Sequence, residues 1–310
     1  MKPVYVINGF LESGKTEFIS FTLAQPYFKS RGTTLLLVCE EGETEYDEKL
    51  LKKTKTVLQV IDDEASFNPA NLLEIEKKIK PERIIVEYNG MWNPKNMTMP
   101  VHWELEQQIT VINGATFPMY YSNMKSLVAE QVRKSELVIF NRCDNIPEKT
   151  LSSYKRNVKA VNPDTEIVFE DKNGEINQMF EDDLPYDLKE NTLVLDNKGY
   201  GIWYIDSMEH LDRYIGKTIV FEALVMRPSK FPKGFFVPGR MAMTCCAEDM
   251  AFIGYACRYD GAENLKEASW IKVTAVVKKE YFSDYKKEGP VLYATEVVPC
   301  SKPEDDVITW

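Results

Sequence analysis

The feature that most constrains this chain is a glycine-rich segment near its start, Gly9-Phe10-Leu11-Glu12-Ser13-Gly14-Lys15-Thr16. A glycine, four residues and then Gly-Lys-Thr is the spacing of a phosphate-binding loop. The apolar run Val4–Ile7 precedes it and predicts a buried strand, and Glu17–Leu23 predicts a helix after it. Because strand, loop and helix follow in the required order, we predict a phosphate site here rather than a glycine-rich turn that binds nothing.

The chemistry of the loop follows from its residue types. Glycines let successive backbone N–H groups face an anion, and the N-terminus of the following helix adds partial positive charge. The Lys15 ammonium can reach the β- and γ-phosphates of a nucleotide, and the Thr16 hydroxyl can ligate Mg²⁺. We expect a nucleotide to contact a set of residues from this segment, namely Gly9, Glu12, Ser13, Gly14, Lys15, Thr16 and Glu17.

The first half of the chain alternates apolar runs with polar, helix-like segments. Such alternation is typical of a parallel sheet that is covered on both faces, so we predict an α/β fold: a doubly wound P-loop NTPase with a mostly parallel sheet. The predicted strands after the loop are Thr34–Val38, Ile84–Val86, Thr110–Ile112, Leu137–Phe140 and Glu166–Phe169, with a helix over Ala70–Lys80.

The pattern changes near Phe180, and short strands separated by turn residues follow. Five to six such strands predict a small all-β domain, an OB-like barrel or a sandwich, with a short helix over Met208–Tyr214. We therefore expect a P-loop domain at 1–185, a linker at 186–200 and the β domain at 201–310. The predicted strands are Gly201–Ile205, Thr218–Met226, Phe235–Cys245, Ala251–Cys257, Trp270–Lys279 and Val291–Val298.

Composition excludes several classes of function. A net charge of −10 argues against a nonspecific nucleic-acid surface, which needs a basic face. The sequence has no run of 18 apolar residues and no apolar signal-peptide core, so we expect a cytoplasmic protein without a membrane span. Six cysteines are too few for a disulfide scaffold and would stay thiols there.

Two further segments carry nucleotide signals. Asn141-Arg142-Cys143-Asp144 follows a predicted strand, where an aspartate can accept from N1–H and the exocyclic amine of guanine and an asparagine can position the base. We favour a guanine reader made of Asn141, Arg142 and Asp144 over a plain turn, because a phosphate loop lies upstream. Glu87 ends another predicted strand, where its carboxylate would face the Mg²⁺ edge of the site.

Together these segments resemble the CobW-type GTPases of the metallochaperone class. The resemblance covers about 1–185, and its motifs are Val6–Thr16, Cys39–Glu43 with Asp47, Glu87–Gly90 with Pro94, Asn141–Asp144 and Asn162-Pro163. It implies a GTPase that uses GTP and Mg²⁺ as a switch while handling metal ions or metal cofactors, with a client metalloprotein or metal transporter as partner.

Catalytic roles are expected for Lys15, Thr16, Glu40 and Glu87, and the Mg²⁺ shell is expected to include Thr16, Glu87 and Asp47. Lys15 would stabilise the transferring phosphate and Thr16 would hold Mg²⁺. Glu40, Asp47 and Glu87 are the acidic candidates for the metal shell or for orienting water, and sequence does not rank them. The segment 39–47 is expected to be a switch that orders around the γ-phosphate.

The chain also departs from the family pattern. The usual cysteine metal motif is absent, since no cysteine lies between Cys39 and Cys143, and Glu17 replaces a usual threonine. These departures leave open an alternative from another class: a degenerate P-loop adaptor that binds a protein partner through its β domain without significant turnover.

The second half offers its own metal candidate. The segment Gly239–Asp249 resembles part of the C-terminal domain of YcgQ-type proteins, which implies an OB-like barrel and, by association, metal homeostasis. Cys245, Cys246 and Cys257, with Asp249, could form a tetrahedral Zn²⁺ site. Buried core is the equally weighted alternative, because cysteine often packs as a small hydrophobe.

Overall fold

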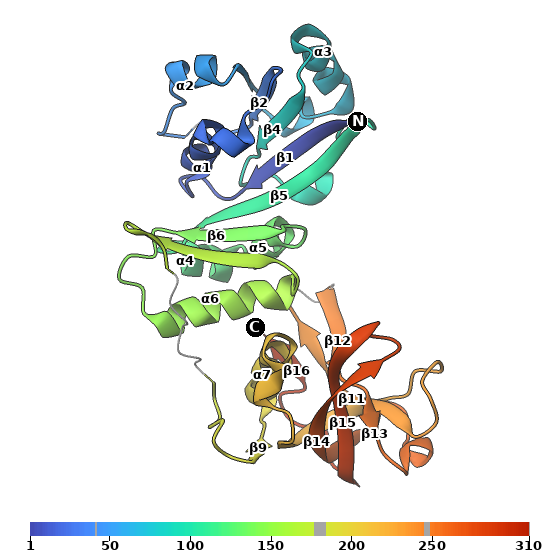
Figure 1. The fold of residues 1–310 in the computed structure, drawn as a ribbon. Helices are drawn as coiled ribbons and strands as arrows, with labels where there is room; N and C mark the ends of the chain where they lie inside the picture. Colours follow the sequence, from blue (N-terminus) through green and yellow to red (C-terminus); the bar gives the residue numbers. More distant parts are fainter. Residues whose placement is uncertain (41, 177–183, 245–248, 310) are drawn as a thin grey trace. The chain divides into compact units, whose positions relative to one another are not determined.

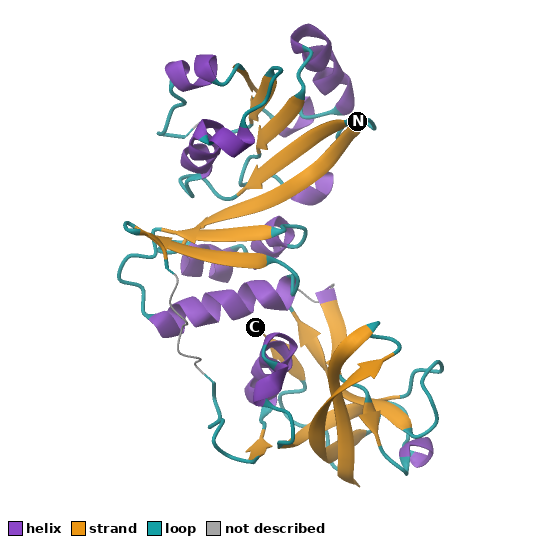
Figure 2. Ribbon diagram, in the orientation of Figure 1, coloured by secondary structure: helices purple, strands orange, loops and turns teal. Residues whose placement is uncertain are grey.

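The computed structural model describes residues 1–40, 42–176, 184–244 and 249–309 (Figure 1). The chain forms two compact units: residues 1–151 with 161–180, and residues 152–160 with 181–310. Helices and parallel strands alternate in the first unit, whereas strands dominate the second (Figure 2).

The first unit contains a sheet with the strand order β3-β2-β4-β1-β5-β6-β7-β8. Every neighbouring pair is parallel except the last, so the prediction of a mostly parallel sheet is confirmed. The strands are β1 Lys2–Asn8, β2 Thr34–Val38, β3 Thr56–Val60, β4 Arg83–Glu87, β5 Trp103–Asn113, β6 Leu137–Asn141, β7 Glu166–Asp171 and β8 Gly174–Glu175.

Burial on both faces explains why the central strands are continuous apolar runs. All residues of β2 and β4 are buried. Along β2, Leu35 and Leu37 pack into the cluster that contains Leu72, while Leu36 and Val38 pack into the cluster that contains Ile19. The helices are α1 Lys15–Ala24, α2 Glu48–Lys53, α3 Pro69–Ile79, α4 Phe117–Asn123, α5 Lys125–Val132 and α6 Glu148–Val161.

Parallel register brings the carboxyl ends of the central strands to one edge of the sheet. Ile7 of β1 and Val38 of β2 both pair with Glu87, the last residue of β4. The glycine-rich segment begins directly after Asn8, the last residue of β1. Ligands of open α/β sheets bind outside the carboxyl ends of the strands, so the topology itself places the site.

The second unit is a closed five-stranded ring. Strand β10 pairs with β14, β14 with β15, β15 with β13, β13 with β11, and β11 returns to β10. Only β13–β15 is parallel in this ring, and closure of this kind matches the predicted OB-like barrel. The strands are β9 Thr192–Val194, β10 Thr218–Met226, β11 Phe235–Met243, β12 Met250–Gly254, β13 Cys257–Arg258, β14 Trp270–Phe282, β15 Lys287–Pro299 and β16 Val307–Thr309.

One predicted strand of this unit is a helix. Gly201–Ile205 lies inside α7, Asn197–Glu209, so the expected strand there is wrong and the expected helix at Met208–Tyr214 begins eleven residues earlier. Burial explains the error: Tyr200 and Trp203 are fully buried in the barrel core, and a short helix that is apolar all round has no amphipathic period. The Asp196 carboxylate caps α7 by accepting from the Gly199 N–H at 2.6 Å.

The segment expected as a linker, 186–200, contains regular structure instead. Strand β9 pairs in parallel with β10, and the first residues of α7 follow. The second domain is therefore not purely β. Within the part of the chain that the structure describes, no helix has the length and apolar character needed to cross a membrane.

Candidate nucleotide site

The glycine-rich loop needs its glycines for steric reasons. Gly9 has φ of 140°, and a Cβ there would lie 2.2 Å from the Val111 carbonyl oxygen. Gly14 has φ of 97° at the N-cap of α1, and a Cβ there would lie 2.4 Å from the Asn141 amide nitrogen. Both positions combine a left-handed backbone with close packing, so side chains are excluded and the backbone can wrap tightly.

Lys15 begins α1 and is buried, with its ammonium held inside the loop. Lys15 Nζ donates to the carbonyl oxygens of Gly9 at 2.8 Å and Phe10 at 3.0 Å. It also forms an ion pair with Glu40, at 2.6 Å from Oε2. Glu40 lies two residues after the end of β2, and the structure brings together two of the residues for which sequence predicted catalytic roles.

The next residue of α1 contacts the end of β4. Thr16 Oγ1 donates to Glu87 Oε1 at 2.8 Å, and the Tyr46 hydroxyl donates to Glu87 Oε2 at 2.5 Å. Glu87 is 3 % exposed. Burial raises the pKa of this carboxyl above its ordinary value, against the opposing effect of the two hydrogen bonds and of Lys15. A buried carboxylate with a hydroxyl partner is a suitable ligand pair for a hard cation.

The donor set fits an anionic ligand, and the loop is closed in this conformation. The cavity lined by the loop, Glu40 and Glu87 has a volume of about 20 Å³. Such a space admits roughly one water molecule. The buried Ser13 Oγ and Asn141 Oδ1 have no hydrogen-bond partner among the described residues. A phosphate therefore needs the Lys15–Glu40 pair to separate, and polar atoms beside the loop are free to receive ligands.

Hydrogen bonds join the predicted base-reading segment, residues 141–144, to the phosphate loop. Asn141 Nδ2 donates to the Ser13 carbonyl oxygen at 2.7 Å. Arg142 Nη1 donates to the Glu12 carbonyl oxygen at 2.9 Å, and its Nη2 lies 3.3 Å from the Glu17 carboxylate. The Glu17 carboxylate, in the first turn of α1, is therefore paired with the Arg142 guanidinium.

Asp144, the predicted guanine reader, lies at the open end of this segment. It is exposed, and one of its carboxylate oxygens accepts from the Lys172 N–H at 3.2 Å. Its other oxygen has no hydrogen-bond partner among the described residues and can accept a further hydrogen bond. This arrangement suits a residue that accepts hydrogen bonds from a base.

Asp47 lies apart from the Thr16–Glu87 pair. Its carboxylate caps α2 by accepting from the Lys49 N–H at 2.9 Å. Its neighbour Tyr46, which sequence analysis did not select, makes the hydrogen bond to Glu87. Neither periodicity nor charge identifies a tyrosine in this role.

Sequence analysis also missed a glutamine behind the loop. Gln131 in α5 is 3 % exposed, and its amide donates to the Gly90 carbonyl oxygen at 2.8 Å. Its backbone oxygen accepts from Thr110 Oγ1 at 2.8 Å. These contacts tie α5 to the segment that follows Glu87. Nothing in the sequence pattern around Gln131 signals this role.

The predicted zinc residues are only partly described. Cys245 and Cys246 lie outside the described residues. Cys257 is fully buried in the apolar core of the barrel, and burial raises the pKa of its thiol well above the ordinary value. A thiol held neutral fits the core alternative. The described residues contain no group of three or more His, Cys, Asp or Glu side chains suited to a metal ion.

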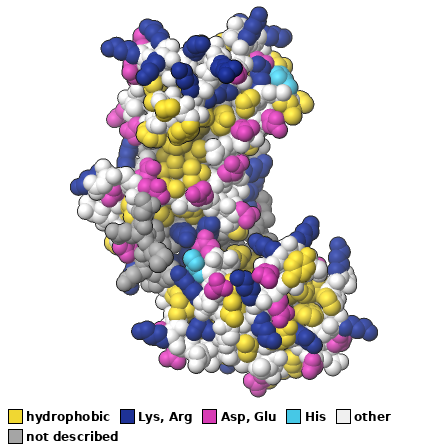
Figure 3. All heavy atoms as spheres, in the orientation of Figure 1, with side chains coloured by type: hydrophobic (Ala, Val, Ile, Leu, Met, Phe, Trp, Pro, Cys, Tyr) yellow, Lys and Arg dark blue, Asp and Glu magenta, His cyan; other side chains and the backbone are white. Residues whose placement is uncertain are grey.

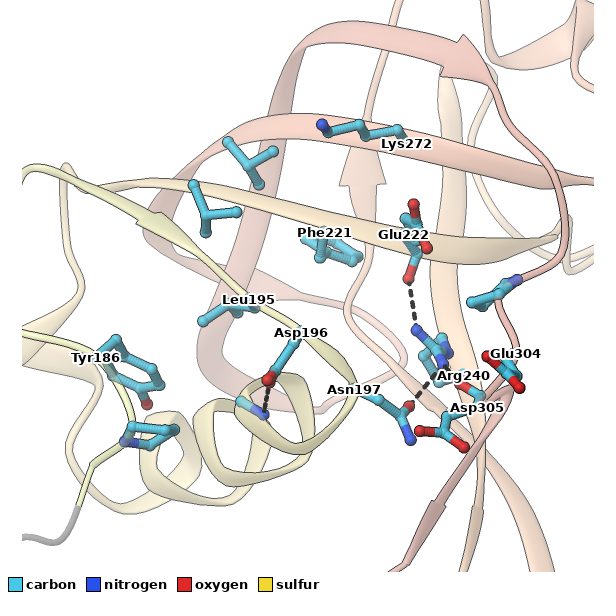
Figure 4. A pocket seen from close by; sticks show the side chains of 15 residues that line it. Tyr186, Leu195, Asp196, Asn197, Phe221, Glu222, Arg240, Lys272, Glu304 and Asp305 are labelled. Atoms are coloured by element: carbon cyan, nitrogen blue, oxygen red, sulfur yellow. Dashed lines mark hydrogen bonds between the residues drawn. The ribbon is translucent and has the colours of Figure 1, made fainter.

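The second unit has a separate cavity of about 530 Å³ (Figure 4). Arg240 lies beside it and is 3 % exposed, and its guanidinium donates to the Glu222 carbonyl at 3.2 Å and to Asn197 Oδ1 at 2.5 Å. The described lining includes Asp196, Glu222 and Asp305 but neither cysteine nor histidine. Among the described residues, this cavity therefore offers no thiol ligand for zinc.

Comparison with known families agrees with this division of the chain. Residues 3–169 match the CobW/HypB/UreG nucleotide-binding domain. Residues 170–308 match the DUF1980 C-terminal domain. The two matches together cover almost the whole chain and meet at 169/170, about ten residues before the change of pattern near Phe180.

Curated relatives are distant. The chain is 23 % identical over 217 residues to "Zinc-regulated GTPase metalloprotein activator 1" of Dictyostelium discoideum, covering 54 % of this chain and 45 % of that protein. It is 22 % identical over 215 residues to "Zinc chaperone CobW" of a Sinorhizobium species, covering 56 % and 60 %. The chain thus spans less than two thirds of the length of either relative.

Two solved structures are also similar. The hydrogenase maturation factor HypB of Archaeoglobus fulgidus aligns with a TM-score of 0.39 and 16 % identity, over 56 % of this chain and 84 % of that one. Zn(II)-bound YjiA GTPase of E. coli aligns with a TM-score of 0.41 and 12 % identity, over 94 % and 88 %. The family assignment rests on the domain match, which covers more than half of the chain. Through its first domain, the chain belongs to the CobW/HypB/UreG nucleotide-binding family.

Proposed function

We propose that the first domain binds GTP with Mg²⁺ and hydrolyses it slowly, as a switch in the handling of a metal ion or a metal cofactor. One observation carries the proposal: Lys15 and Thr16, adjacent on α1, contact Glu40 and Glu87, which end or follow two neighbouring strands. Four groups of suitable chemistry converge at the edge of the sheet where ligands of such folds bind.

Each side chain has a defined role in this proposal. Lys15 would leave Glu40 and stabilise charge on the transferring phosphate. Thr16 and Glu87 would hold Mg²⁺, whose contribution is to neutralise phosphate charge. Tyr46 keeps the Glu87 carboxylate oriented by donating a hydrogen bond to it. Release of Glu40 would change the conformation of the segment that carries it, which is the switch.

Guanine selectivity rests on Asp144. Its carboxylate would accept from N1–H and the exocyclic amine, and adenine would leave these acceptors unpaired. Asn141 and Arg142 hold this segment against the phosphate loop through Ser13 and Glu12, so base and phosphate sites are fixed relative to each other. This coupling supports one nucleotide bound across both.

The metal is proposed as cargo and not as a resident cofactor of the first domain. Both curated relatives carry zinc in their names, and one is called a metalloprotein activator. Zinc is therefore the first metal to test, and a metalloprotein or a metal transporter is the proposed client. Cys39 and Cys143 are both buried and belong to different strand ends, so they do not form a ligand pair.

The decisive experiment compares phosphate release from GTP and ATP by wild type and Lys15→Ala. Turnover of GTP that needs Mg²⁺, exceeds ATP turnover and disappears in Lys15→Ala supports the proposal. Binding of a protein partner without turnover in either form would instead favour the degenerate P-loop adaptor.

A further inference from the structure

A second cleft lies in the first unit, away from the phosphate loop. Its volume is about 830 Å³, and its walls include the end of α1, the end of α2 and the segment before β2. Clefts of roughly 300–1,000 Å³ suit small-molecule ligands. Its apolar wall residues are Leu23, Ala24, Pro26 and Leu50.

The charge of this cleft has one sign. Five cationic residues line it, and no aspartate or glutamate does so among the described residues: Lys29, Arg31, Lys53, Lys55 and Arg83. Lysine and arginine side chains gather at the upper end of the first unit (Figure 3). In a protein of net charge −10, such a concentration is not an average surface. It favours an anionic ligand.

Ordinary structural roles account for only part of this set. Lys53 lies in the last turn of α2, where cations complement the helix dipole. Lys55 Nζ donates to the Arg31 carbonyl oxygen at 3.1 Å, and Lys29, Arg31 and Arg83 lie outside helices. Glu82, the nearest carboxylate in sequence to Arg83, accepts from Ser30 Oγ at 2.7 Å and from the Gly32 N–H, and from outside the cleft lining it also attracts Arg83 and Arg31.

Arg83 is a cleft residue whose side chain is buried and held in place by its neighbours. It is 8 % exposed, its Nε donates to Thr34 Oγ1 at 2.9 Å, and its guanidinium lies 3.9 Å from the centroid of the Phe28 ring. These two contacts fix the plane of the guanidinium. Among the described residues, its two terminal nitrogens make no hydrogen bond. The edge formed by these two nitrogens can bind a phosphate or a carboxylate in a bidentate manner.

The cleft is at the opposite edge of the sheet from the nucleotide site. Arg83 is the first residue of β4 and Glu87 is the last. Four residue steps along a strand span roughly 13 Å. Thr34 likewise begins β2, whereas Glu40 follows its end. A ligand in this cleft is therefore separate from a nucleotide at the phosphate loop.

We propose that this cleft is a second anion site, which binds a small molecule carrying two or more phosphate groups. Arg83 binds one phosphate in a bidentate manner at the wall, and the exposed lysines contact the others. The volume of the cleft and its single buried anchor favour a small ligand over an extended acidic peptide.

Tripolyphosphate is the probe, and calorimetry of the full-length Lys15→Ala protein is the assay. This background weakens the phosphate loop, so the result is independent of whether GTP binds there. We expect one tripolyphosphate per chain. Absence of binding in this background would overturn the proposal, while leaving the GTPase proposal to its own test.

Two charge-reversal pairs locate the site. Lys29→Glu with Lys53→Glu changes exposed cleft residues, and affinity should fall by about tenfold or more. Lys77→Glu with Lys78→Glu makes the same change of charge in the last turn of α3, outside the cleft, and should leave affinity close to the starting value. Equal weakening by both pairs would mean diffuse attraction and no site.

The variant Arg83→Lys keeps the positive charge but removes the planar guanidinium, so it tests which of the two the ligand needs. Circular dichroism establishes that the variant is folded, and affinity should again fall by about tenfold, because lysine cannot bind in a bidentate manner. Unchanged affinity would remove Arg83 as the anchor. Tighter binding of hexaglutamate than of tripolyphosphate would overturn the ligand class and assign the cleft to a protein segment.

Discussion

Lys15 Nζ and Glu40 Oε2 lie 2.6 Å apart, and their side chains are 3 % and 10 % exposed. The Glu40 carboxylate is paired with the Lys15 ammonium, which is the group that a nucleotide phosphate would need. Coulomb attraction at this separation is strong where water is largely excluded. The closed loop is thus an internally neutralised state, and phosphate binding exchanges one anion for another.

Glu40→Gln should tighten nucleotide binding, since the amide competes less well for Lys15. We expect the dissociation constant of GDP to fall by roughly three- to tenfold, equivalent to about 1 kcal/mol. Titration calorimetry measures it. Glu43→Gln, a nearby exposed carboxylate, is the matched control and should change little. Weaker binding in Glu40→Gln would show that Glu40 contributes to the nucleotide complex itself.

Lys15→Ala should abolish GTP turnover and weaken GTP binding. Loss of a charge aimed at the transferring phosphate typically costs on the order of 10²–10³ in kcat. Phosphate release under saturating GTP measures the effect. Equal turnover by wild type and variant would mean that the phosphate loop is not the active site.

Glu87→Gln should stabilise the nucleotide-free protein and eliminate Mg²⁺-dependent turnover. Burial raises the pKa of Glu87, so the folded state binds the proton more tightly than the unfolded state does. Stability of the wild type should therefore fall as pH rises from about 4.5 through the raised pKa. Glu87→Gln has no titrating group at this position, so its stability does not fall over this pH range. At neutral pH its free energy of unfolding should exceed that of the wild type by about 0.5–2 kcal/mol.

Denaturant unfolding of both proteins at several pH values tests this. The stability difference should grow with pH and then become constant above the raised pKa. A wild type that is more stable than Glu87→Gln at neutral pH would mean that the Tyr46 and Thr16 hydrogen bonds outweigh the cost of burying the charge.

Asp144→Asn should shift base preference from guanine toward xanthine, since the amide replaces one acceptor by a donor. A mismatch of this kind costs about 1–3 kcal/mol. Competition among GTP, ATP and XTP for a labelled nucleotide gives the ranking. If GTP and ATP compete equally for the wild type, Asp144 does not select the base.

Cys257→Ser should destabilise the second domain without changing its metal content. The thiol makes only a long contact, 3.8 Å, with the Arg258 carbonyl oxygen, and burying a more polar hydroxyl in this apolar core costs about 1–3 kcal/mol. Thermal unfolding and metal analysis of the full chain measure the two effects. Zinc lost in Cys257→Ser, as in a Cys245→Ser and Cys246→Ser double variant, would restore Cys257 as a ligand.

The fold was predictable where burial is two-sided. β2 and β4 are buried along their whole length, so each appears as a continuous apolar run. β3 was missed because it lies at the edge of the sheet, where exposed residues interrupt the apolar pattern. α7 was misassigned for the opposite reason: burial around the helix removes the polar face that identifies helices.

The site was predictable where a motif fixes the backbone. The positions of Lys15, Thr16 and Asn141 follow from a loop between known elements. The Lys15–Glu40 pair and the Tyr46–Glu87 hydrogen bond depend on how the segment after β2 folds back, and no local pattern specifies that path. The Arg83 cleft joins residues from three separate stretches of the chain, 23–31, 50–55 and position 83, which sequence spacing does not connect.

The closed ring of the second unit has a consequence for how the chain folds. β10 must pair with β14, some fifty residues later, and β13 needs β15 for its parallel partner. At a synthesis rate of about 5–20 residues per second, β10 waits several seconds before its partners exist. The first unit has all its central strands by Asn141. During translation it can therefore complete its core while the barrel sequence is still being made.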